Sequence, residues 1–505
     1  MADPPERTWR NAVAASLSDI PTLDFAQLRQ RALKACREGG RIVALFALPR
    51  SSDKRAHEVY LVLADDDASK LRFWRALSAG GEPFPSLSRE LPAAQAFERE
   101  MHEQHGIEVE GHPWLKPLRR HLEIGAGPGG GEGPRGRRFF QVSGAGVHEV
   151  AVGPVHAGII EPGHFRFQCH GERVLSLEIH LGYQHRGVEA LLLRASPARR
   201  LVVAESIAGD TAVGHALAHC TVMEALAGSS PPLAAQSIRG LALELERMAN
   251  HVGDLGALAG DVAFLPGAAY FGRLRGDFLN LLMELSGNRY GRSLLSVGGV
   301  RFGLDEPKRK AFAARLEKDE ADFESIAGLM FDAGSVVSRF ERTGVVSEEM
   351  ARDLGLAGPV ARASGVSRDV RRDHPAGIYR FAYLPVSVGR TGDVMARALV
   401  RRLEVQRSLA FAREQLHQLS DTPLAASGLA AAAPNRMAVA LVEGWRGEIA
   451  HVAITGEEGQ LRGYKVVDPS FRNWFGLGMA LRGNQISDFP LCNKSFNLSY
   501  AGHDL

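Results

Sequence analysis

Apolar residues in the second half of the chain recur three and four positions apart, the spacing of one face of an α-helix. The clearest case spans residues 236–258, where two prolines at 231 and 232 form the turn ahead of the helix. Similar patterns predict long helices over about 272–285, 306–331 and 394–419. Helices of this length bury their apolar faces by packing as a bundle. The recurring positions of the first one are Ile238, Leu241, Leu245, Met248, Val252 and Leu255.

Strand-like runs lie on both sides of this helical region. Among the first 120 residues, apolar runs at 41–48 and 58–64 predict strands, and the pattern at 25–37 predicts a helix ahead of them. Two further strand-like runs occupy 437–443 and 448–455. The sequence therefore predicts an α+β fold.

A glycine-rich stretch at residues 124–138 separates the two regions. Its glycines make ordering entropically costly, and it has no apolar face to bury. We predict a small α/β module over residues 1–123, a linker over 124–138, and a mainly helical module over 139–505.

Composition narrows the class of protein. With 45% apolar and 23% charged residues, the 505-residue chain resembles a soluble globular protein of two to four domains. A net charge of +2 gives no reason to expect nucleic acid or an anionic membrane as partner. No run reaches the length of about 18 apolar residues that a spanning helix needs, and the N-terminus lacks the pattern of a signal peptide. We expect a cytoplasmic location, with membrane association only through partners.

Four widely separated cysteines, Cys36, Cys169, Cys220 and Cys492, form no Cys-x-x-Cys motif. A disulfide scaffold is therefore implausible. We interpret these residues as small buried apolar side chains or surface thiols rather than as metal ligands.

Two neighbouring motifs are the most informative part of the chain. Residues 153–167 read Gly-Pro-Val-His-Ala-Gly-Ile-Ile-Glu-Pro-Gly-His-Phe-Arg-Phe, and residues 181–189 read Leu-Gly-Tyr-Gln-His-Arg-Gly-Val-Glu. They resemble the opening β-hairpin and first helix of the large subunit of energy-converting nickel–iron hydrogenases. The same fold serves as the quinone-side 49-kDa subunit of respiratory complex I. The resemblance continues at 358–366, 369–373, 392–397, 442–448 and 468–474. It implies a mainly helical, hydrogenase-type domain that begins with a hairpin.

The end of the first module resembles the 30-kDa subunit of complex I, which docks beside the large subunit. The chain departs from that family at residues 103–105, Glu-Gln-His. The resemblance implies that residues 1–123 are a docking domain fused to the large subunit. A metal site built from the acids and histidines of this element is the alternative. The matching residues are Glu98, Arg99, Glu100, Gly106, Gly111, His112 and Pro113.

The thiolates that hold nickel and iron in hydrogenases are missing. By the resemblance, the first Cys-x-x-Cys pair falls at Ala208 and Thr211, and the second at Ser499 and Gly502. None of these side chains is a soft sulfur ligand. We therefore predict no metal in this chain and no activation of hydrogen.

Polar residues near the lost ligands are candidates for a remaining function. The resemblance implies that His215, Asp210 and Arg186, with Glu189 and Asp504, line the space where the metal sits in hydrogenases. Buried groups of this kind must be paired, and their pKa values move. Two interpretations stay open: a proton relay or small-ligand site, and a polar network that fills the space.

His156 and His164 lie on the hairpin that reaches into the quinone cavity of complex I. A histidine there can donate a hydrogen bond to a quinone and move a proton near neutral pH. Their spacing of eight is of the hydrogenase type and is longer than the spacing on the complex I hairpin. The alternative is that both histidines shape an interface with neighbouring subunits.

These features predict a peripheral-arm subunit of a complex I-like, hydrogenase-related membrane oxidoreductase. It would couple electron transfer, quinone chemistry or protonation to ion translocation. The expected partners are a small iron–sulfur subunit and membrane subunits of the antiporter-like and quinone-site types, on the cytoplasmic side of the cell membrane.

Cofactors are expected mostly outside this chain. Iron–sulfur clusters belong to the partners and quinone is a candidate ligand, whereas NAD is reached only through the wider complex. The glycine run at 125–136 is no dinucleotide fingerprint, because no strand precedes it and no suitable helix follows. The alternatives are a structural adaptor with a vestigial site and a formate hydrogenlyase-type hydrogenase with an unusual site.

Overall fold

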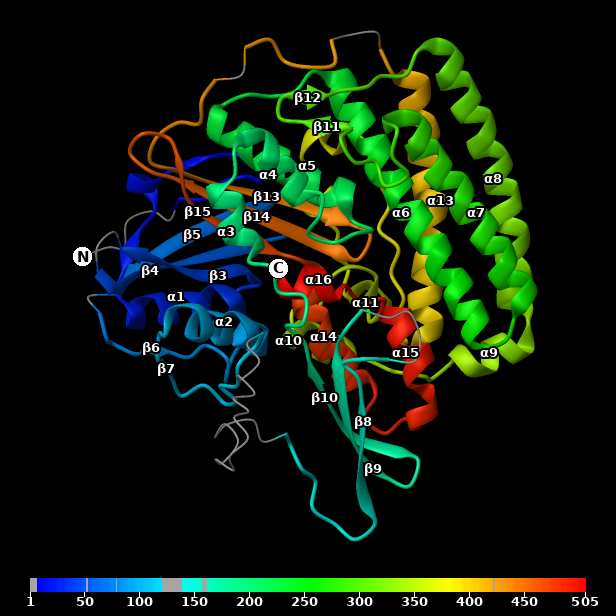
Figure 1. The fold of residues 1–505 in the computed structure, drawn as a ribbon, viewed down its shortest axis with the longest axis horizontal. Helices are drawn as coiled ribbons and strands as arrows, with labels where there is room; N and C mark the ends of the chain where they lie inside the picture. Colours follow the sequence, from blue (N-terminus) through cyan, green and yellow to red (C-terminus); the bar gives the residue numbers. More distant parts are fainter. Residues whose placement is uncertain are drawn as a thin grey trace, which may run out of the picture.

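The computed structural model describes residues 7–50, 53–78, 80–119, 139–156, 161–420, 423–428 and 430–505. The linker predicted at 124–138 lies outside these residues. Two four-stranded sheets, a bundle of long helices and a projecting three-stranded sheet make up the molecule (Figure 1). The predicted α+β class is confirmed.

The first module is built on a sheet with strand order β2-β5-β4-β3, in which β2 and β5 run parallel and the other pairs antiparallel. Helix α1 begins where the sequence predicts, because Asp24 and Gln27 form a reciprocal capping box. The predicted strands at 41–48 and 58–64 are confirmed as parts of β3 and β4. The elements are β2 (Thr22–Leu23), α1 (Phe25–Arg37), β3 (Arg41–Arg50), β4 (Asp53–Asp65), β5 (Lys70–Leu77), β6 (Phe84–Pro85), α2 (Gln95–His105) and β7 (Val109–Glu110).

A second sheet, with order β1-β13-β14-β15, lies in the middle of the molecule (Figure 1). Its first strand comes from the N-terminal segment. Residues ahead of the first module's sheet in the sequence therefore pair with a strand of the second module. The predicted strands at 437–443 and 448–455 are confirmed here. The strands are β1 (Ala15–Ser16), β13 (Arg436–Gly444), β14 (Gly447–Thr455) and β15 (Leu461–Val467).

Both faces of this central sheet are buried, since successive side chains point to opposite faces. On β13, Met437, Val439 and Leu441 pack into the core of the first module. Ala438 and Ala440 point the other way, into a cluster formed with helices α3 (Val188–Arg194), α4 (Pro197–Ala204) and α5 (Ala212–Ala227). One continuous apolar core therefore joins the first module to the central sheet.

Ion pairs reinforce this junction. Arg41 of β3 donates two hydrogen bonds to Glu448 of β14, at 2.8 and 2.5 Å, and a further pair to Asp66. Glu100 of α2 is buried between Lys465 of β15, at 2.5 Å, and Arg119. These charges are costly to bury singly, so each carboxylate depends on its cations across the junction.

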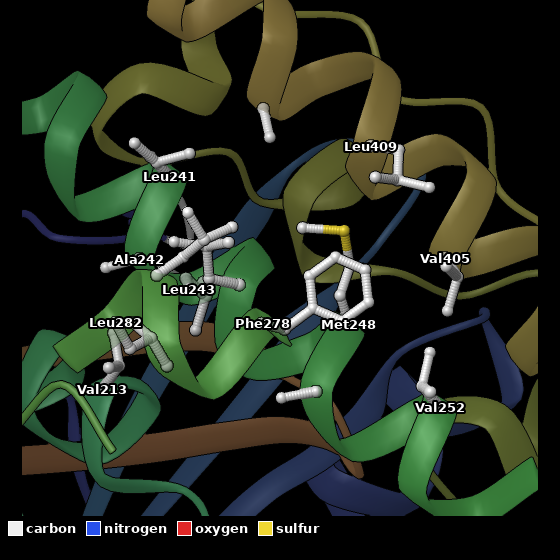
Figure 2. Packing of buried hydrophobic residues seen from close by; sticks show 14 of the residues in the cluster. Val213, Leu241, Ala242, Leu243, Met248, Val252, Phe278, Leu282, Val405 and Leu409 are labelled. Carbon is white, nitrogen blue, oxygen red and sulfur yellow. The ribbon is translucent and has the colours of Figure 1, made fainter. Parts of the chain in front are cut away.

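The long helices form the largest apolar cluster (Figure 2). Helix α6 packs against both α7 and α13, and its buried residues include all six positions of the predicted apolar face. The predicted helices at 272–285, 306–331 and 394–419 are confirmed. Their ends agree with the prediction to within one residue, except that α7 begins earlier, at Leu265. The helices of this region are α5 (Ala212–Ala227), α6 (Leu233–Asp261), α7 (Leu265–Ser286), α8 (Glu306–Asp332), α9 (Gly334–Phe340) and α13 (Val394–Gln418).

The hairpin sheet β10-β9-β8 projects from the body beside the C-terminal helices (Figure 1). Phe165 and Phe167 anchor it on Phe489 and Trp474. Two short strands, β11 (Leu295–Ser296) and β12 (Gly299–Val300), pair elsewhere. The remaining elements are β8 (Val147–Val152), β9 (His164–His170), β10 (Arg173–His180), α3 (Val188–Arg194), α4 (Pro197–Ala204), α10 (Glu348–Asp353), α11 (Gly358–Ala363), α12 (Val370–Asp373), α14 (Pro469–Ala480), α15 (Phe489–Phe496) and α16 (Tyr500–Asp504).

Replacing Glu100 should weaken the junction between the two modules. Glu100→Ala leaves Lys465 and Arg119 buried without their shared carboxylate, which costs about 3–5 kcal/mol. We expect a clearly lower urea midpoint for the full chain, whereas Glu108→Ala, an exposed control between α2 and β7, should leave it unchanged. Equal midpoints for the two variants would show that this pair does not hold the junction.

Candidate functional site

A tight turn between β13 and β14 brings Trp445 and Arg446 to the centre of the site. Gly444 and Gly447 pair with each other, so only these two residues form the turn. Gly447 has a φ of +132°, and a Cβ there would lie 2.6 Å from the backbone nitrogen of Gly358. Glycine is therefore required for the turn to lie this close to α11.

The guanidinium of Arg446 forms hydrogen bonds both to the segment before α5 and to the C-terminal tail. Its two Nη atoms donate to the carboxylate of Asp210, at 2.6 and 2.8 Å. Its Nε donates to the carbonyl of Asn497 at 2.5 Å, and its Cζ lies 3.9 Å from the centre of the Trp445 ring. Burial raises the pKa of Asp210, but the charge and hydrogen bonds of Arg446 outweigh it and hold that pKa below its usual range.

The resemblance assigns the four cysteine positions to the segment before α5 and to the C-terminal tail, and Thr211 among them contacts this ion pair directly. The hydroxyl of Thr211 lies 3.1 Å from Nε1 of Trp445 and 3.2 Å from Arg446. The hydroxyl of Ser499 accepts from the backbone N–H of Gly502 at 2.9 Å and caps α16. Ala208 is fully buried and offers only a methyl group.

Gly502 is the position at which the fit of a cysteine ligand can be tested most directly. A Cβ at this position would lie 2.6 Å from Cγ of Asp468, so a carboxylate stands where a cysteine side chain would begin. Nickel and iron in this fold need soft thiolates. A methyl, two hydrogen-bonded hydroxyls and an occupied glycine position do not fit such a centre.

Neighbouring thiols do not substitute for the missing ones. The sulfur of Cys492 packs on Gly344 and the guanidinium of Arg397, and burial raises its pKa to about 11. Burial raises the pKa of Cys220 to about 12. Within the described part of the chain, no three His, Cys, Asp or Glu side chains converge as a metal-ligand set.

His215 is fully buried on α5, next to this site. Its Nε2 lies 3.1 Å from Oδ2 of Asp468, and its Nδ1 lies 3.1 Å from Nε2 of His451 on β14. Asp468 follows β15 directly and caps α14 through the N–H of Ser470 at 2.7 Å. His215 is thus joined to the site through a carboxylate rather than exposed to it.

Each hairpin histidine forms a hydrogen bond to a backbone carbonyl on the opposite side of the hairpin. His156 Nε2 donates to the carbonyl of Gly163 at 3.0 Å, and His164 Nδ1 donates to the carbonyl of Gly153 at 2.9 Å. The other nitrogen of His164 accepts from Nε of Arg166 at 3.3 Å. Both ring nitrogens of His164 are therefore engaged, whereas Nδ1 of His156 has no hydrogen-bond partner among the described residues.

Arg186 closes the site on the side of the C-terminus. It donates to the carbonyls of Ser206 and Ile207, at 2.7 and 2.8 Å. Burial lowers its pKa, against the neighbouring charges of Glu161 and Asp504. The carboxylate of Asp504 itself accepts from two backbone N–H groups in the segment between β10 and α3, those of residues 182 and 184.

The predicted residues thus fall into three groups. Asp210 contacts Thr211, one of the positions that the resemblance assigns to a metal ligand, and Arg186 lies nearby. His215 reaches a second such position, Gly502, through Asp468, and His156 and His164 lie in the hairpin. Among the described residues, no hydrogen bond joins either hairpin histidine to the other three.

Several site residues were missed by the sequence analysis. Glu161, at the return of the hairpin, accepts from the N–H of Tyr500 at 3.3 Å and lies close enough to Arg446 for the cation to lower its pKa, although burial raises it overall. Glu246 of α6 accepts from two N–H groups at the start of α5, and burial raises its pKa to about 8. The signals for Arg446 and Asp468 were present, since both lie in motifs that carry the family resemblance.

A cavity of about 440 Å³ opens between residues 95–118 of the first module and β10. Trp114, Phe140 and Phe475 supply aromatic walls, and Lys116 lies 4.5 Å from the ring of Trp114. Its size and aromatic lining are those of a site for a small apolar ligand.

Two family models match the chain. The first, described as the respiratory-chain NADH dehydrogenase 30 Kd subunit, covers residues 22–128, and the second, the 49 Kd subunit of the same enzyme, covers residues 261–440. The chain belongs to the family of large subunits shared by energy-converting hydrogenases and respiratory NADH dehydrogenases, with a 30-kDa-type domain fused to it. The resemblance predicted from the sequence is confirmed.

Curated relatives come from both branches of this family. The chain is 32% identical to carbon monoxide-induced hydrogenase of Rhodospirillum rubrum, over 70% of this chain and 97% of the relative. It is 28% identical to formate hydrogenlyase subunit 5 of Escherichia coli (strain K12), over 93% and 85%. It is 31% identical to an NADH-quinone oxidoreductase subunit of Clostridium beijerinckii, over 64% and 87%. These relatives place the chain among the large subunits of complex I-like or hydrogenase-related membrane complexes.

No helix in the described ranges has the length and apolar character needed to cross a membrane.

Asp210→Asn should destabilise the site by removing the charge opposite Arg446. We expect a loss of about 2–3 kcal/mol, below the roughly 3–5 kcal/mol of a fully buried pair, because the Asp210 side chain is 33% exposed. Since the folded-state pKa of Asp210 is lowered, its contribution is present above the unfolded value of about 4 and is lost as the pH falls further. The difference in Tm between wild type and variant should therefore shrink in acid. Asp353→Asn, at an exposed carboxylate on α10, is the control, and a pH-independent difference would contradict this account.

Proposed function

We propose that this chain is the large peripheral-arm subunit of a complex I-like membrane oxidoreductase that works without a nickel–iron centre. Its site handles protons, a quinone or both, and couples electron arrival from an iron–sulfur partner to ion movement in membrane subunits. Hydrogen is not its substrate.

The observation that carries the proposal is the carboxylate of Asp468 beside Gly502, together with the ion pair of Asp210 and Arg446. In a hydrogenase site, anionic thiolates and a metal would occupy this space. Here two carboxylates and one guanidinium occupy it, and the guanidinium is held by hydrogen bonds of 2.5 to 3.2 Å. Arg446 compensates the charge of Asp210, and Asp468 accepts hydrogen bonds from His215 and from the N–H of Ser470, so each carboxylate has partners without a metal.

The hairpin supplies the element that would meet a substrate. His156 is half-buried at its end, with Nδ1 available for a hydrogen bond, and His164 fixes the strands on which His156 is held. Because Nε2 carries the proton donated to Gly163, Nδ1 of the neutral ring accepts a hydrogen bond, and only the protonated ring would donate from Nδ1 to a quinone carbonyl and pass it a proton. The aromatic cavity beside β10 provides apolar walls for a ring or tail.

The proposed surroundings follow from the family. The 30-kDa-type module and the hairpin sheet would face a small iron–sulfur subunit and the quinone-site and antiporter-like membrane subunits, on the cytoplasmic side of the membrane. NAD would react only elsewhere in such a complex.

The second candidate is a structural adaptor with a vestigial site. The full engagement of His164 within the hairpin and the continuous core between the modules favour it. The two candidates differ in whether changes at the site reduce turnover or only assembly.

The assembled complex should contain no stoichiometric nickel bound to this chain and should show no hydrogen-dependent dye reduction. Elemental analysis of the complex purified through a tag on this chain, together with a viologen assay under hydrogen, measures both. About one nickel atom per chain, or hydrogen uptake, would refute the metal-free site and favour the hydrogenase alternative.

His156→Gln should lower turnover but not assembly. Loss of a positioned proton donor costs roughly 10²-fold or more in rate. The assay uses membranes with the assembled complex, reduced methyl viologen as donor and a short-chain ubiquinone as acceptor. His148→Gln, at an exposed position of β8 in the same sheet, is the matched control.

His164→Ala separates the two roles on the hairpin. Because it removes a bond to each of Gly153 and Arg166, we expect less assembled complex as well as lower turnover. Full turnover per assembled complex in both the His156 and His164 variants would leave the structural adaptor as the better account.

A further inference from the structure

Five buried side chains form one unbranched line of hydrogen bonds beside the site. From Asp468 the line passes to His215 at 3.1 Å, to His451 at 3.1 Å, to the hydroxyl of Tyr464 at 2.8 Å, and to Nδ1 of His219 at 2.9 Å. Each of the five side chains belongs to a residue no more than 3% exposed.

Helix α5 and two strands of the central sheet position this line. His215 and His219 are four residues apart on α5 and therefore point to the same side of the helix. His451 on β14 and Tyr464 on β15 lie on the face of the central sheet that packs against α5, since Ala453, two residues from His451, pairs with Tyr464. The line runs from helix to sheet and back, between two packed layers.

The proton positions along the line are determined by its ends. An ionised Asp468 only accepts, so Nε2 of His215 carries a proton and Nδ1 accepts. His451 must then donate from Nε2 and accept at Nδ1 from the hydroxyl of Tyr464. The oxygen of Tyr464 in turn accepts from Nδ1–H of His219. With neutral imidazoles only one arrangement satisfies all four bonds, and every proton in it points toward Asp468.

The surroundings support these protonation states. Alanines and aliphatic residues of the cluster formed by the sheet and α3–α5 enclose Tyr464. Burial lowers the pKa of His219 to about 3 and that of His451 well below its usual range. Hydrogen bonding to His215 helps to hold the pKa of Asp468 below its usual range, against burial.

The line joins two different parts of the molecule. Asp468 lies against Gly502, at a lost ligand position, and within the electrostatic reach of Arg446. His219 lies at the other end, near the half-buried Arg200 of α4, whose charge adds to the lowering of its pKa.

We propose that Asp468, His215, His451, Tyr464 and His219 form a proton wire between the Arg446–Asp210 site and the α4 side of the central sheet. The proposal rests on the function proposed above, because it assigns the wire to proton delivery at that site.

One passage moves one proton and no electrons. A proton from solvent on the α4 side binds Nε2 of His219, whose Nδ1–H passes to Tyr464. The hydroxyl proton of Tyr464 passes to Nδ1 of His451, the Nε2–H of His451 to Nδ1 of His215, and the Nε2–H of His215 to Asp468. Asp468 becomes neutral and donates to the acceptor in the site. The three imidazoles are left in the opposite tautomers, so they must reset before a second proton passes.

The resting arrangement can be measured without any assay of activity. In the assembled complex with ¹⁵N-histidine in this chain alone, solid-state NMR should show Nε2–H tautomers for His215 and His451 and an Nδ1–H tautomer for His219. Spectra of the single His→Gln variants assign the signals. Opposed tautomers at His215 and His451, or a charged imidazole at neutral pH, would overturn the wire even if quinone reduction by the complex is established.

Tyr464→Phe tests transport, because it removes the one hydroxyl that links His451 to His219. We expect a roughly 10²-fold loss of viologen-driven quinone reduction per assembled complex. Tyr379→Phe is the matched control, a buried tyrosine whose hydroxyl instead donates to Glu244 at 2.7 Å. His219→Gln should reproduce the loss if Tyr464→Phe fails to assemble. Full turnover in both wire variants would overturn the proposal, whereas a wild type that reduces no quinone would refute the proposed function and leave the NMR result to decide the wire.

Discussion

The pairing of Arg446 with Asp210 is the interaction on which the rest of the site depends. The side chain of Arg446 is 5% exposed, and an unpaired charge so deeply buried would cost several kcal/mol. Asp210 compensates that charge, and the same guanidinium holds the carbonyl of Asn497. One cation therefore fixes the β13–β14 turn, the segment before α5 and the C-terminal tail relative to one another. In a hydrogenase, ligation of a metal by both cysteine pairs would draw the same two segments together.

The central sheet extends this constraint through the molecule. Because β13 and β14 are buried on both faces, a change on one face is transmitted to the packing of the other. One face carries His451 toward α5, and the other packs on the first module, where Glu448 meets Arg41. The first module and the site thus share one sheet, which agrees with the proposed transmission of a local change in charge to neighbouring subunits.

The local elements were predictable because their signals are local. The three-and-four spacing over 236–258 predicts α6, and the capping pair of Asp24 and Gln27 matches the predicted start of α1. The partners of the strands were not predictable in this way. An apolar run such as 437–443 indicates burial on both faces but not which module covers each face. The division into domains at 1–123 and 139–505 stays a prediction.

The candidate site was predictable only in part. The match of Ala208, Thr211, Ser499 and Gly502 to the ligand positions of hydrogenases comes from motifs and stays a prediction. The pairing of Asp210 with Arg446 spans 236 residues and follows from no spacing rule. His219, His451 and Tyr464 carry no motif and become a line only when α5 packs on the sheet. The roles of His156 and His164 stay predictions, and the structure distinguishes them by their hydrogen bonds.

The most direct test of the central claim is an experimental structure of the intact complex, with anomalous scattering recorded at the nickel edge. The account predicts the guanidinium of Arg446 bonded to the carboxylate of Asp210, the carboxylate of Asp468 against Gly502, and no anomalous peak between these groups. A metal peak among residues 208, 211, 499 and 502, with Arg446 turned away from Asp210, would contradict it.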